Sequence, residues 1–272
     1  MDRTIRSIIR ISTFITFSTL FFIIAYILIK GIPSLDLSLF QLEYTTENVS
    51  LFPAMVTTLM LIALTLIIAT PIGIFTAFYL VEYAKKDSKI VEAIRIATET
   101  LSGIPSIVYG LFGMLFFVIR LNFKYSLLAG ALTVGIMVLP LIIRTAEEAL
   151  LSVDNSLREA SFGLGAGKLR TIFRIVLPVA MPGILSGVIL SIGRIVGETA
   201  ALMFTLGTAT KIPEGLFSSG RTLALHMYVL STEGLNVNES YATGVILLLV
   251  VLIVNGLSTL LSNKLAKGNE DE

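Results

Sequence analysis

Long apolar runs recur along this chain and constrain its fold more than any other feature. A helix needs about 20 mostly apolar residues to cross the hydrocarbon core of a bilayer. Apolar residues make up 55% of the 272 positions and charged residues only 14%, whereas soluble domains are about a quarter charged. The sequence therefore predicts an all-α, polytopic membrane protein, a single transmembrane domain over 1–272 in a lipid bilayer. The six expected spans are residues 11–29, 54–81, 104–119, 126–143, 179–206 and 241–261.

The distribution of Lys and Arg indicates how these spans are oriented. Fourteen of the 20 basic residues fall in the N-terminal segment, the second and fourth connections and the tail, and five fall in the other connections. The second connection alone carries Lys85, Lys86, Lys89 and Arg95. Cytoplasmic loops carry the basic excess, so both termini are expected in the cytoplasm, as an even number of crossings requires. The first apolar run is longer than the core of a cleaved signal peptide and lacks its cleavage site, so we expect a retained helix.

Composition disfavours several classes of function. The 20 basic and 19 acidic residues leave no basic excess of the kind that binds nucleic acid. Without cysteine there is no thiol chemistry, and the single histidine, His226, is expected in a loop. We therefore expect no metal site and no catalytic residues. A membrane enzyme is the least favoured class, because apart from Glu198 the spans offer no acid–base constellation.

Prolines and glycines mark places where the helices should deviate or pack closely. Pro71 and Pro140 fall inside spans, where proline kinks or breaks a helix. The fifth span contains two small-xxx-small pairs, a pattern typical of close helix–helix contact. This contact would either line a pathway or serve packing alone. The four residues are Gly183, Gly187, Gly193 and Gly197.

The connection over 144–178 is too long for a simple turn, and its apolar residues recur at helical spacing. Asn155 or Ser156 is expected to cap a first short helix. Gly163, Gly165 and Gly167 then interrupt it before a second one. Two amphipathic helices joined at a glycine hinge suit docking into a groove of another protein.

Two arginines and a glutamate in or near the spans are candidates for a translocation pathway, because an ionisable residue inside a membrane marks one by default. Arg194 and Glu198 are four residues apart in the fifth span, which would place them on one helix face, able to pair. An arginine facing a water-filled cavity suits a tetrahedral oxyanion. Alternatively, Arg194 only neutralises Glu198. Arg144 ends the fourth span and either lines the pathway or extends to the interface.

The 144–178 connection also resembles the EAA loop of bacterial ABC-importer permeases. The matching residues are Glu159, Ala160, Ser161, Gly165, Ile175, Leu177 and Pro178, with Ser161 in place of the third small residue. The resemblance implies a type I ABC-importer permease fold, with a coupling helix at Glu159 and Ala160 that inserts into an ATP-binding subunit. Gly163 to Leu169 imitates a P-loop but lacks its first glycine and its hydroxyl. We therefore expect ATP and magnesium on the partner, and no cofactor on this chain.

Further segments are similar to phosphate ABC transporter permeases of the PstA type. They are Arg144-Thr-Ala-Glu-Glu, Asn155-Ser-Leu-Arg-Glu-Ala, Gly193-Arg-Ile-Val-Gly-Glu-Thr-Ala and Ser102-Gly-Ile-Pro-Ser-Ile-Val-Tyr-Gly. The resemblance implies inorganic phosphate as substrate, with Arg144, Arg194 and Glu198 in its path. It implies three partners: a PstC-type permease, a PstB-type ATPase dimer and a PstS-type phosphate-binding protein. The alternatives are the PstC-type subunit itself, a permease for sulfate or molybdate, and a channel or secondary transporter.

Overall fold

Helices build the described part of the chain. The computed structural model describes residues 3–85 and 88–267, and these contain no β-strand. Lys86, one of the basic residues used to predict orientation, lies outside them. The elements are α1 (Arg3–Gly31), η1 (Ile32–Ser34), η2 (Leu37–Phe40), α2 (Phe52–Phe78), η3 (Tyr79–Tyr83), α3 (Lys89–Ser102), α4 (Ser106–Gly113), η4 (Met114–Arg120), α5 (Leu127–Leu151), α6 (Asn155–Gly163), α7 (Lys168–Thr171), η5 (Ile172–Val176), α8 (Leu177–Val196), α9 (Ala200–Thr205), α10 (Leu223–Glu233) and α11 (Val237–Lys267).

Five helices, with the turns that continue them, are long and apolar enough to cross a membrane. A sixth is reached if α3 is counted together with α4 and η4, which meet it at a bend of 105°. The prediction of an all-α protein with about six membrane helices is confirmed. The five are Thr4–Ser34, Phe52–Tyr83, Leu127–Leu151, Lys168–Val196 and Val237–Leu260.

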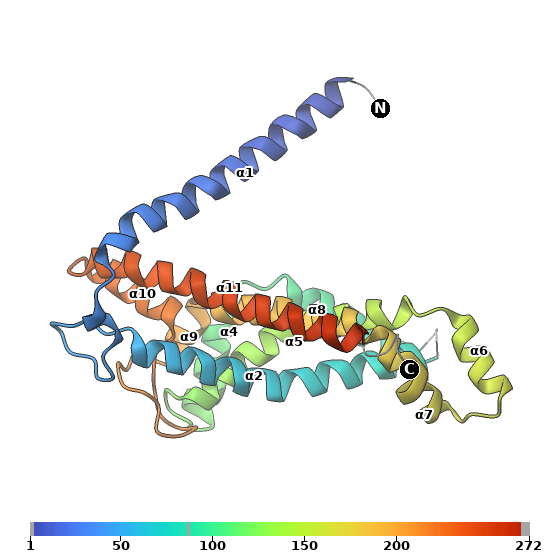
Figure 1. The fold of residues 1–272 in the computed structure, drawn as a ribbon. Coiled ribbons are helices and arrows are strands. Elements are labelled where there is room, and N and C mark those ends of the chain that lie inside the picture. The colour runs from blue at the N-terminus through green and yellow to red at the C-terminus, as the bar shows by residue number, and fades with distance from the viewer. Residues whose placement is uncertain (1–2, 86–87, 268–272) are drawn as a thin grey trace.

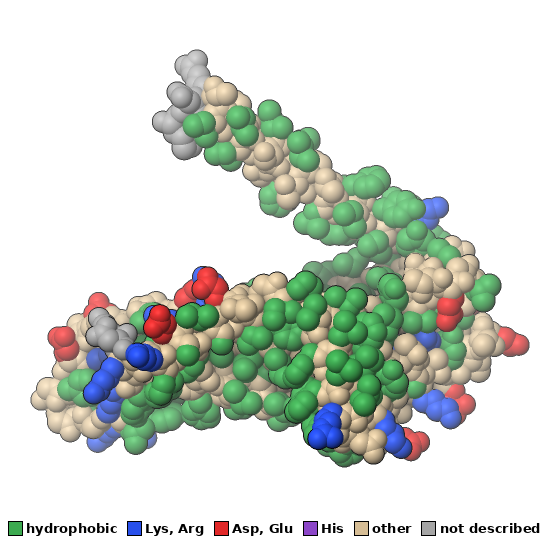
Figure 2. All heavy atoms as spheres, turned by 180° about the vertical axis from the view of Figure 1, so that it is seen from behind, with side chains coloured by type: hydrophobic (Ala, Val, Ile, Leu, Met, Phe, Trp, Pro, Cys, Tyr) green, Lys and Arg blue, Asp and Glu red, His purple; other side chains and the backbone are tan. Residues whose placement is uncertain are grey.

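Helices α2, α5, α8 and α11 form a bundle, and α6 and α7 project beyond one end of it (Figure 1). We call the projecting part, residues 152–171, the knob. The start of α1 and the end of α11 both lie toward the knob end. Hydrophobic side chains cover the middle of the face seen in Figure 2, and most charged ones lie toward the ends. This distribution is the one that a bilayer around the middle of the bundle requires.

Helix α5 is the centre of the bundle. It packs against α2, α8, α3, α4 and α9, and 67% of its most apolar window is buried, against 0% for α1. Ser126 caps it by accepting a hydrogen bond from the Ala129 backbone N–H at 3.2 Å. Helix α1 instead contacts α11 at its C-terminal end, near Gly31, and its N-terminal part points away from the bundle (Figure 1). The site described below is therefore built on α5.

The third and fifth spans differ from the sequence prediction. The third was expected at 104–119, but the helix there, Ser106–Arg120, reaches the length of a span only together with Lys89–Ser102. The chain bends by 105° between the two, where Pro105 disfavours helical backbone in the residue before it. The fifth, expected at 179–206, starts at Lys168 and ends at Val196. Its helix passes Pro178 through the π-helical turn η5, an adjustment that membrane helices use around proline.

Two more boundaries differ from the prediction. The connection expected at 144–178 is shorter, because α5 continues to Leu151 and the fifth helix begins at Lys168. Pro71 and Pro140 lie inside α2 and α5 without ending either helix. As a result Arg144 lies two turns before the end of α5, where it faces a cavity shared with α3 and α8.

Candidate functional site

A polar cavity of about 360 Å³ brings together the two arginines that the sequence analysis singled out. Arg144 comes from α5 and Arg194 from the last turn of α8. Helix α3 and η3 close the remaining sides. We call this cavity the basic pocket; its lining residues are Leu80, Arg95, Thr98, Glu99, Ser102, Pro140, Leu141, Ile143, Arg144, Glu147 and Arg194.

Arg194 lies deep along the bundle. The α5 and α8 helices pack so closely that a Cβ on Gly187 would overlap the Thr145 hydroxyl. Arg194 is two helical turns further along α8, about 10 Å from that contact at 1.5 Å per residue. Its side chain is exposed within the isolated chain, and among the described residues it forms no ion pair. A charge at this depth without a carboxylate partner requires water or a ligand beside it.

The other two arginines of the basic pocket are paired, whereas Glu99, on α3, forms no ion pair among the described residues. Arg95 contacts Glu147 with 2.6 Å between Nη2 and Oε1, which joins α3 to α5. Arg144 Nε lies 3.2 Å from Glu148 Oε1, one turn along the same helix, and both side chains are largely exposed. An exposed pair of this kind contributes little to stability. Arg144 is therefore free to exchange Glu148 for another anion.

Glu198 does not pair with Arg194, and the expectation that both lie on one helix face is wrong. Helix α8 ends at Val196, so Glu198 follows it in the break before α9. Its carboxylate Oε1 accepts a hydrogen bond from the Ala201 backbone N–H at 2.9 Å, and the residue is buried. A carboxylate at the start of a helix satisfies N–H groups that have no partner within the helix.

The sequence analysis missed α3, which supplies four residues of the basic pocket. The signal was present, because Val91, Ile94, Thr98 and Leu101 are buried or half-buried at helical spacing. These residues fell inside a connection without a long apolar run. The bend after α3 is held by Tyr109, whose hydroxyl donates to the Leu101 carbonyl at 2.6 Å.

The glycines of the fifth span divide into two pairs. A Cβ on Gly183 would lie 2.7 Å from Ala149 Cβ, and one on Gly187 would overlap Thr145. These two glycines bring α8 against α5. A Cβ on Gly193 or Gly197 would meet no side chain within 4 Å in the described part of the chain. The predicted close contact is thus present at Gly183 and Gly187, whereas Gly193 and Gly197, which flank Arg194, meet no side chain of a neighbouring helix.

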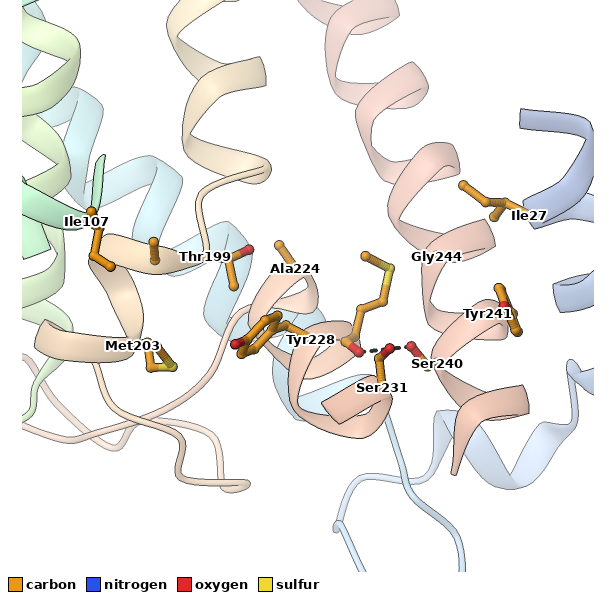
Figure 3. Close-up of a pocket in the computed structure, with 12 residues that line it drawn as sticks. Ile27, Ile107, Thr199, Met203, Ala224, Tyr228, Ser231, Ser240, Tyr241 and Gly244 are labelled. Carbon is orange, nitrogen blue, oxygen red and sulfur yellow. Dashed lines mark hydrogen bonds between the residues drawn. The ribbon is translucent and has the colours of Figure 1, made fainter. Parts of the chain in front are cut away.

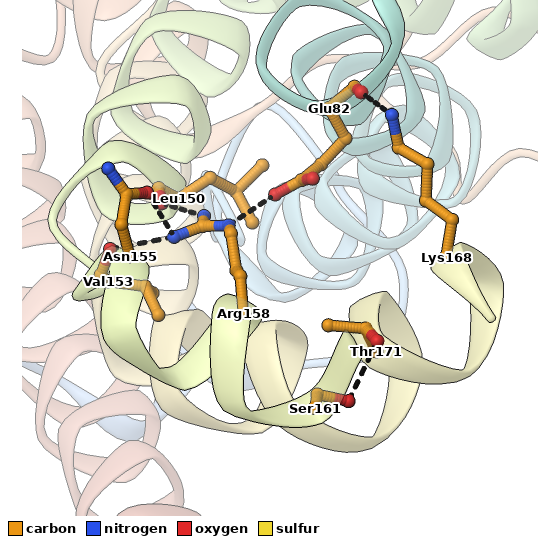
Figure 4. Close-up of polar contacts among 8 residues, drawn as sticks. All are labelled: Glu82, Leu150, Val153, Asn155, Arg158, Ser161, Lys168 and Thr171. Atoms are coloured by element: carbon orange, nitrogen blue, oxygen red, sulfur yellow. Dashed lines mark hydrogen bonds and ion pairs between the residues drawn. The ribbon is translucent and has the colours of Figure 1, made fainter. Parts of the chain in front are cut away.

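The knob residues that resemble the EAA loop differ in their exposure to solvent. Glu159 and Ala160 are exposed on α6, whereas Ser161 is buried and its hydroxyl lies 2.8 Å from the Thr171 hydroxyl (Figure 4). A serine therefore fits at this small-residue position because Thr171 satisfies its hydroxyl. Gly165 has a φ of +81°, a left-handed backbone that favours glycine. A concavity of about 390 Å³ opens beside Ala160, Gly165 and Ile175.

The start of α6 differs from the prediction by one residue. Its cap is Asp154, not Asn155 or Ser156, and Asp154 Oδ1 accepts from the Ser156 backbone N–H at 2.8 Å. This hydrogen bond holds the pKa of the Asp154 carboxyl below its ordinary value. The cap therefore stays ionised at neutral pH.

A second cavity, of about 530 Å³, lies between α1, α4, α9, α10 and α11. Among the described residues no charged side chain lines it (Figure 3). Its lining offers hydroxyl groups but no cationic side chain to an anion, in contrast to the basic pocket. The remaining residues of the EAA-loop resemblance lie where the fifth membrane helix begins. Ile175 is in η5, and Leu177 and Pro178 are the first two residues of α8.

His226 is not a loop residue as expected. It lies in α10, fully buried, with its ring edge-on to Tyr44 at 6.1 Å between centroids. Arg221, also buried, lies over the Tyr44 ring, with its guanidinium carbon 4.7 Å from the ring centroid. The cause is the cap at Thr222, which starts a helix in a stretch that has no long apolar run. Within the described residues no three His, Cys, Asp or Glu side chains gather as a metal site would need.

Comparison with known protein families shows which family this chain belongs to. Residues 69–267 match the family described as the binding-protein-dependent transport system inner membrane component. The chain belongs to this family. The match includes α5, α8, the basic pocket and the knob, whereas α1 lies outside it.

Named relatives of this permease include transporters from several bacteria. It is 32% identical over 254 residues to the probable ABC transporter permease protein YqgI of Bacillus subtilis (strain 168), covering 85% of this chain and 84% of the relative. It is 36% identical over 192 residues to phosphate transport system permease protein PstA 1 of Mycobacterium tuberculosis (strain ATCC 25618 / H37Rv), covering 70% and 62%. It is 42% identical over 179 residues to PstA of Pasteurella multocida (strain Pm70), covering 65% and 63%. The matches thus span about three fifths of these PstA proteins.

Solved structures share the fold of this permease. An inward-facing MetNI methionine ABC transporter superposes with a TM-score of 0.64 at 19% identity, covering 79% of this chain and 94% of the other. A bacterial alginate ABC transporter superposes with a TM-score of 0.65 at 18% identity, covering 98% and 99%. The expected ABC-importer permease fold is confirmed by these neighbours.

Proposed function

We propose that this chain is the PstA-type permease subunit of an ATP-driven importer of inorganic phosphate. The observation that carries the proposal is Arg194, a charged side chain deep in the bundle, exposed to the basic pocket and without an ion-pair partner among the described residues. Its guanidinium suits bidentate hydrogen bonds to a phosphate oxygen pair. The similarity to PstA proteins names phosphate among the oxyanions that such a site could take.

The lining of the basic pocket supports a path in which phosphate passes from one arginine to the next. Arg194 lies deepest, and Arg144 lies nearer the knob with only an exposed partner in Glu148. Two weakly held arginines favour transit, because a site that conducts must release its ligand. In this proposal Glu198 acts indirectly, by capping α9, which follows the helix that carries Arg194.

The knob is proposed as the docking element for an ATP-binding subunit of the PstB type. Glu159 and Ala160 are exposed on α6, and the concavity beside them suits a helix-in-groove contact. ATP and magnesium then belong to that dimeric subunit, and this chain is a non-catalytic part of the complex. A PstC-type permease completes the pathway, and a PstS-type protein delivers phosphate. This arrangement places the knob and both termini in the cytoplasm.

A permease for another oxyanion is the second candidate. Sulfate and molybdate share the tetrahedral shape and negative charge that Arg194 would recognise, so the basic pocket alone does not separate them. The names of the PstA relatives favour phosphate. Competition by sulfate and molybdate belongs in the same experiment.

The test is uptake of radiolabelled phosphate into vesicles that contain the reconstituted complex, with Arg194→Gln compared with wild type. Losing one charge-assisted hydrogen bond corresponds to a factor of about ten or more in rate, so we expect at least a tenfold loss of uptake. Lys211→Gln, which removes an exposed charge outside the basic pocket, should retain wild-type uptake. Unchanged uptake in Arg194→Gln would reject the role of this arginine. Wild-type uptake that sulfate or molybdate abolishes would reject phosphate as the preferred oxyanion, and absence of wild-type uptake would reject it as a substrate.

A further inference from the structure

Arg158 of the knob is the most densely hydrogen-bonded side chain at the knob end. Its guanidinium Nη2 donates to the Leu150 carbonyl at 2.9 Å, and Nη1 donates to the Val153 carbonyl at 2.7 Å and to Asn155 Oδ1 at 3.3 Å. Its Nε donates to Glu82 Oε1 at 3.0 Å. Arg158 therefore joins α6 to the end of α5 and to η3, which continues α2 (Figure 4).

Glu82 holds the other half of the knob as well. Its backbone carbonyl accepts a hydrogen bond from the Lys168 ammonium at the start of α7. The same ammonium lies 4.6 Å from the centre of the Tyr83 ring. Both short helices of the knob are thus hydrogen-bonded to Glu82, near the end of η3. Helix α6 makes this contact through Arg158 and α7 through Lys168.

The Arg158–Glu82 pair is sheltered from water. The side chains are 13% and 9% exposed, whereas Arg95 and Arg144 pair in far more exposed positions. A sheltered pair in which all three guanidinium nitrogens donate is directional, because a planar guanidinium holds its partners in one geometry. Removing one partner leaves the other charge desolvated. This contact therefore resists relative movement of the knob and η3.

The contact also leads to the basic pocket. Leu80, two residues before Glu82, lines that cavity, and so does Arg144 on α5. The Leu150 and Val153 carbonyls that hold Arg158 lie at and just beyond the end of the same α5. A displacement of α6 would consequently reach two walls of the basic pocket through a single side chain.

We propose that Arg158 and Glu82 are positioning residues that couple movement of the knob to the walls of the basic pocket. The inference rests on the proposed function, because it concerns how ATP hydrolysis by the partner reaches the pathway. The pair moves as one rigid joint during transport and stays closed. A contact that only stabilised the knob would affect the amount of assembled complex and not its coupling.

The test measures how strongly the phosphate-loaded binding protein stimulates ATP hydrolysis by the complete complex in vesicles. In Glu82→Gln and Arg158→Gln we expect this stimulation to fall at least threefold per assembled complex, while basal hydrolysis persists. The matched controls are Glu92→Gln and Arg174→Gln, which make the same charge changes at exposed positions and should keep wild-type stimulation. Assembled complex is quantified by co-purification of the ATPase.

A second variant keeps the test decisive where a replacement weakens folding. The chain contains no cysteine, so in Glu82→Cys/Arg158→Cys a short thiol-reactive cross-linker bridges only these two positions of the permease. The unlinked double variant should lose stimulation, and the cross-link should restore it to within about twofold of wild type. A folding defect would not be repaired in this way.

Three results would overturn the inference. One is wild-type stimulation in both Gln variants, and another is basal and stimulated hydrolysis that fall in parallel with complex yield. The third is a cross-link that blocks stimulation, because a joint that must open cannot be rigid. Phosphate uptake by wild type is scored separately: its absence rejects the proposed substrate, whereas the stimulation ratio tests the joint.

Discussion

Single residues decide what the basic pocket can hold, and Glu198 illustrates why neighbours in sequence need not interact. Four residues separate it from Arg194, the spacing of an ion pair on a helix. The helix ends between them, so the carboxylate turns to the Ala201 N–H and Arg194 keeps its exposed side chain. Arg194 is thereby left available for a ligand. In the proposed function Arg194 would contact the ligand, whereas the contact of Glu198 is a structural one with α9.

Replacing Glu198 separates its cap from its charge. Glu198→Gln keeps an oxygen that accepts from Ala201, so thermal unfolding of the detergent-solubilised complex should match wild type. Glu198→Ala leaves a buried N–H without a partner and should lower stability by about 1–3 kcal/mol. Wild-type stability in Glu198→Ala would contradict the capping role. A loss of phosphate uptake in Glu198→Gln at unchanged stability would assign the charge itself to the pathway.

At the scale of elements, the packing of α8 on α5 sets the geometry of the basic pocket. Gly183 and Gly187 allow the two backbones to approach, and Arg194 follows where no such contact exists. Helix α3, set at 105° to the next helix, closes the pocket from the other side. The cavity is therefore a product of three helices that are distant in sequence.

Filling the α5–α8 contact should destabilise the permease. In Gly187→Ala the new methyl group overlaps the Thr145 side chain, and overpacking of this kind costs about 1–3 kcal/mol. Gly193→Ala adds the same methyl group where no side chain lies within 4 Å, and it should stay within about 0.5 kcal/mol of wild type. Thermal unfolding of both variants checks this. Equal stability of Gly187→Ala and wild type would show that the helices separate without loss.

At the scale of the whole molecule, the chain is a membrane bundle with a knob at one end and a diverging helix, α1, at the other (Figure 1). The exposed apolar surface of α1 and the open side of the basic pocket are consistent with a chain that works beside other subunits. In the knob, the exposed residues Glu159 and Ala160 are followed by a turn at Gly165, whose backbone is left-handed. Assembly is consequently expected to depend on the shape of that turn.

Changing the turn should weaken docking of the ATP-binding subunit. Gly165→Leu forces a branched side chain into left-handed backbone, which costs about 1–2 kcal/mol and distorts the exposed face of α6. Gly163→Ala is the control, because its Cβ would meet nothing within 4 Å and its φ is not positive. Less ATPase should co-purify with Gly165→Leu than with wild type or Gly163→Ala. Co-purification at wild-type yield would argue against the knob as the docking element.

The sequence by itself determined the solvent, the helical class and the position of the knob. Long apolar runs indicate membrane helices, because a helix satisfies its own backbone groups in lipid. Gly163, Gly165 and Gly167 indicated an interruption between the two short helices, and Gly165 has the left-handed backbone that favours glycine. Arg144 and Arg194 were found for a similar reason, since a charge is costly in an apolar span. These are local properties, and local rules predict them.

Only the tertiary structure decided which of these residues meet. Glu198 turns away from Arg194 to cap α9, which begins after α8 has ended at Val196, and α3 forms its wall of the pocket by packing on α5. Arg158 and Glu82 lie 76 residues apart and become partners because α2 and α5 end at the same level. Contacts between distant segments follow from the packing of whole helices, which no single stretch of sequence encodes.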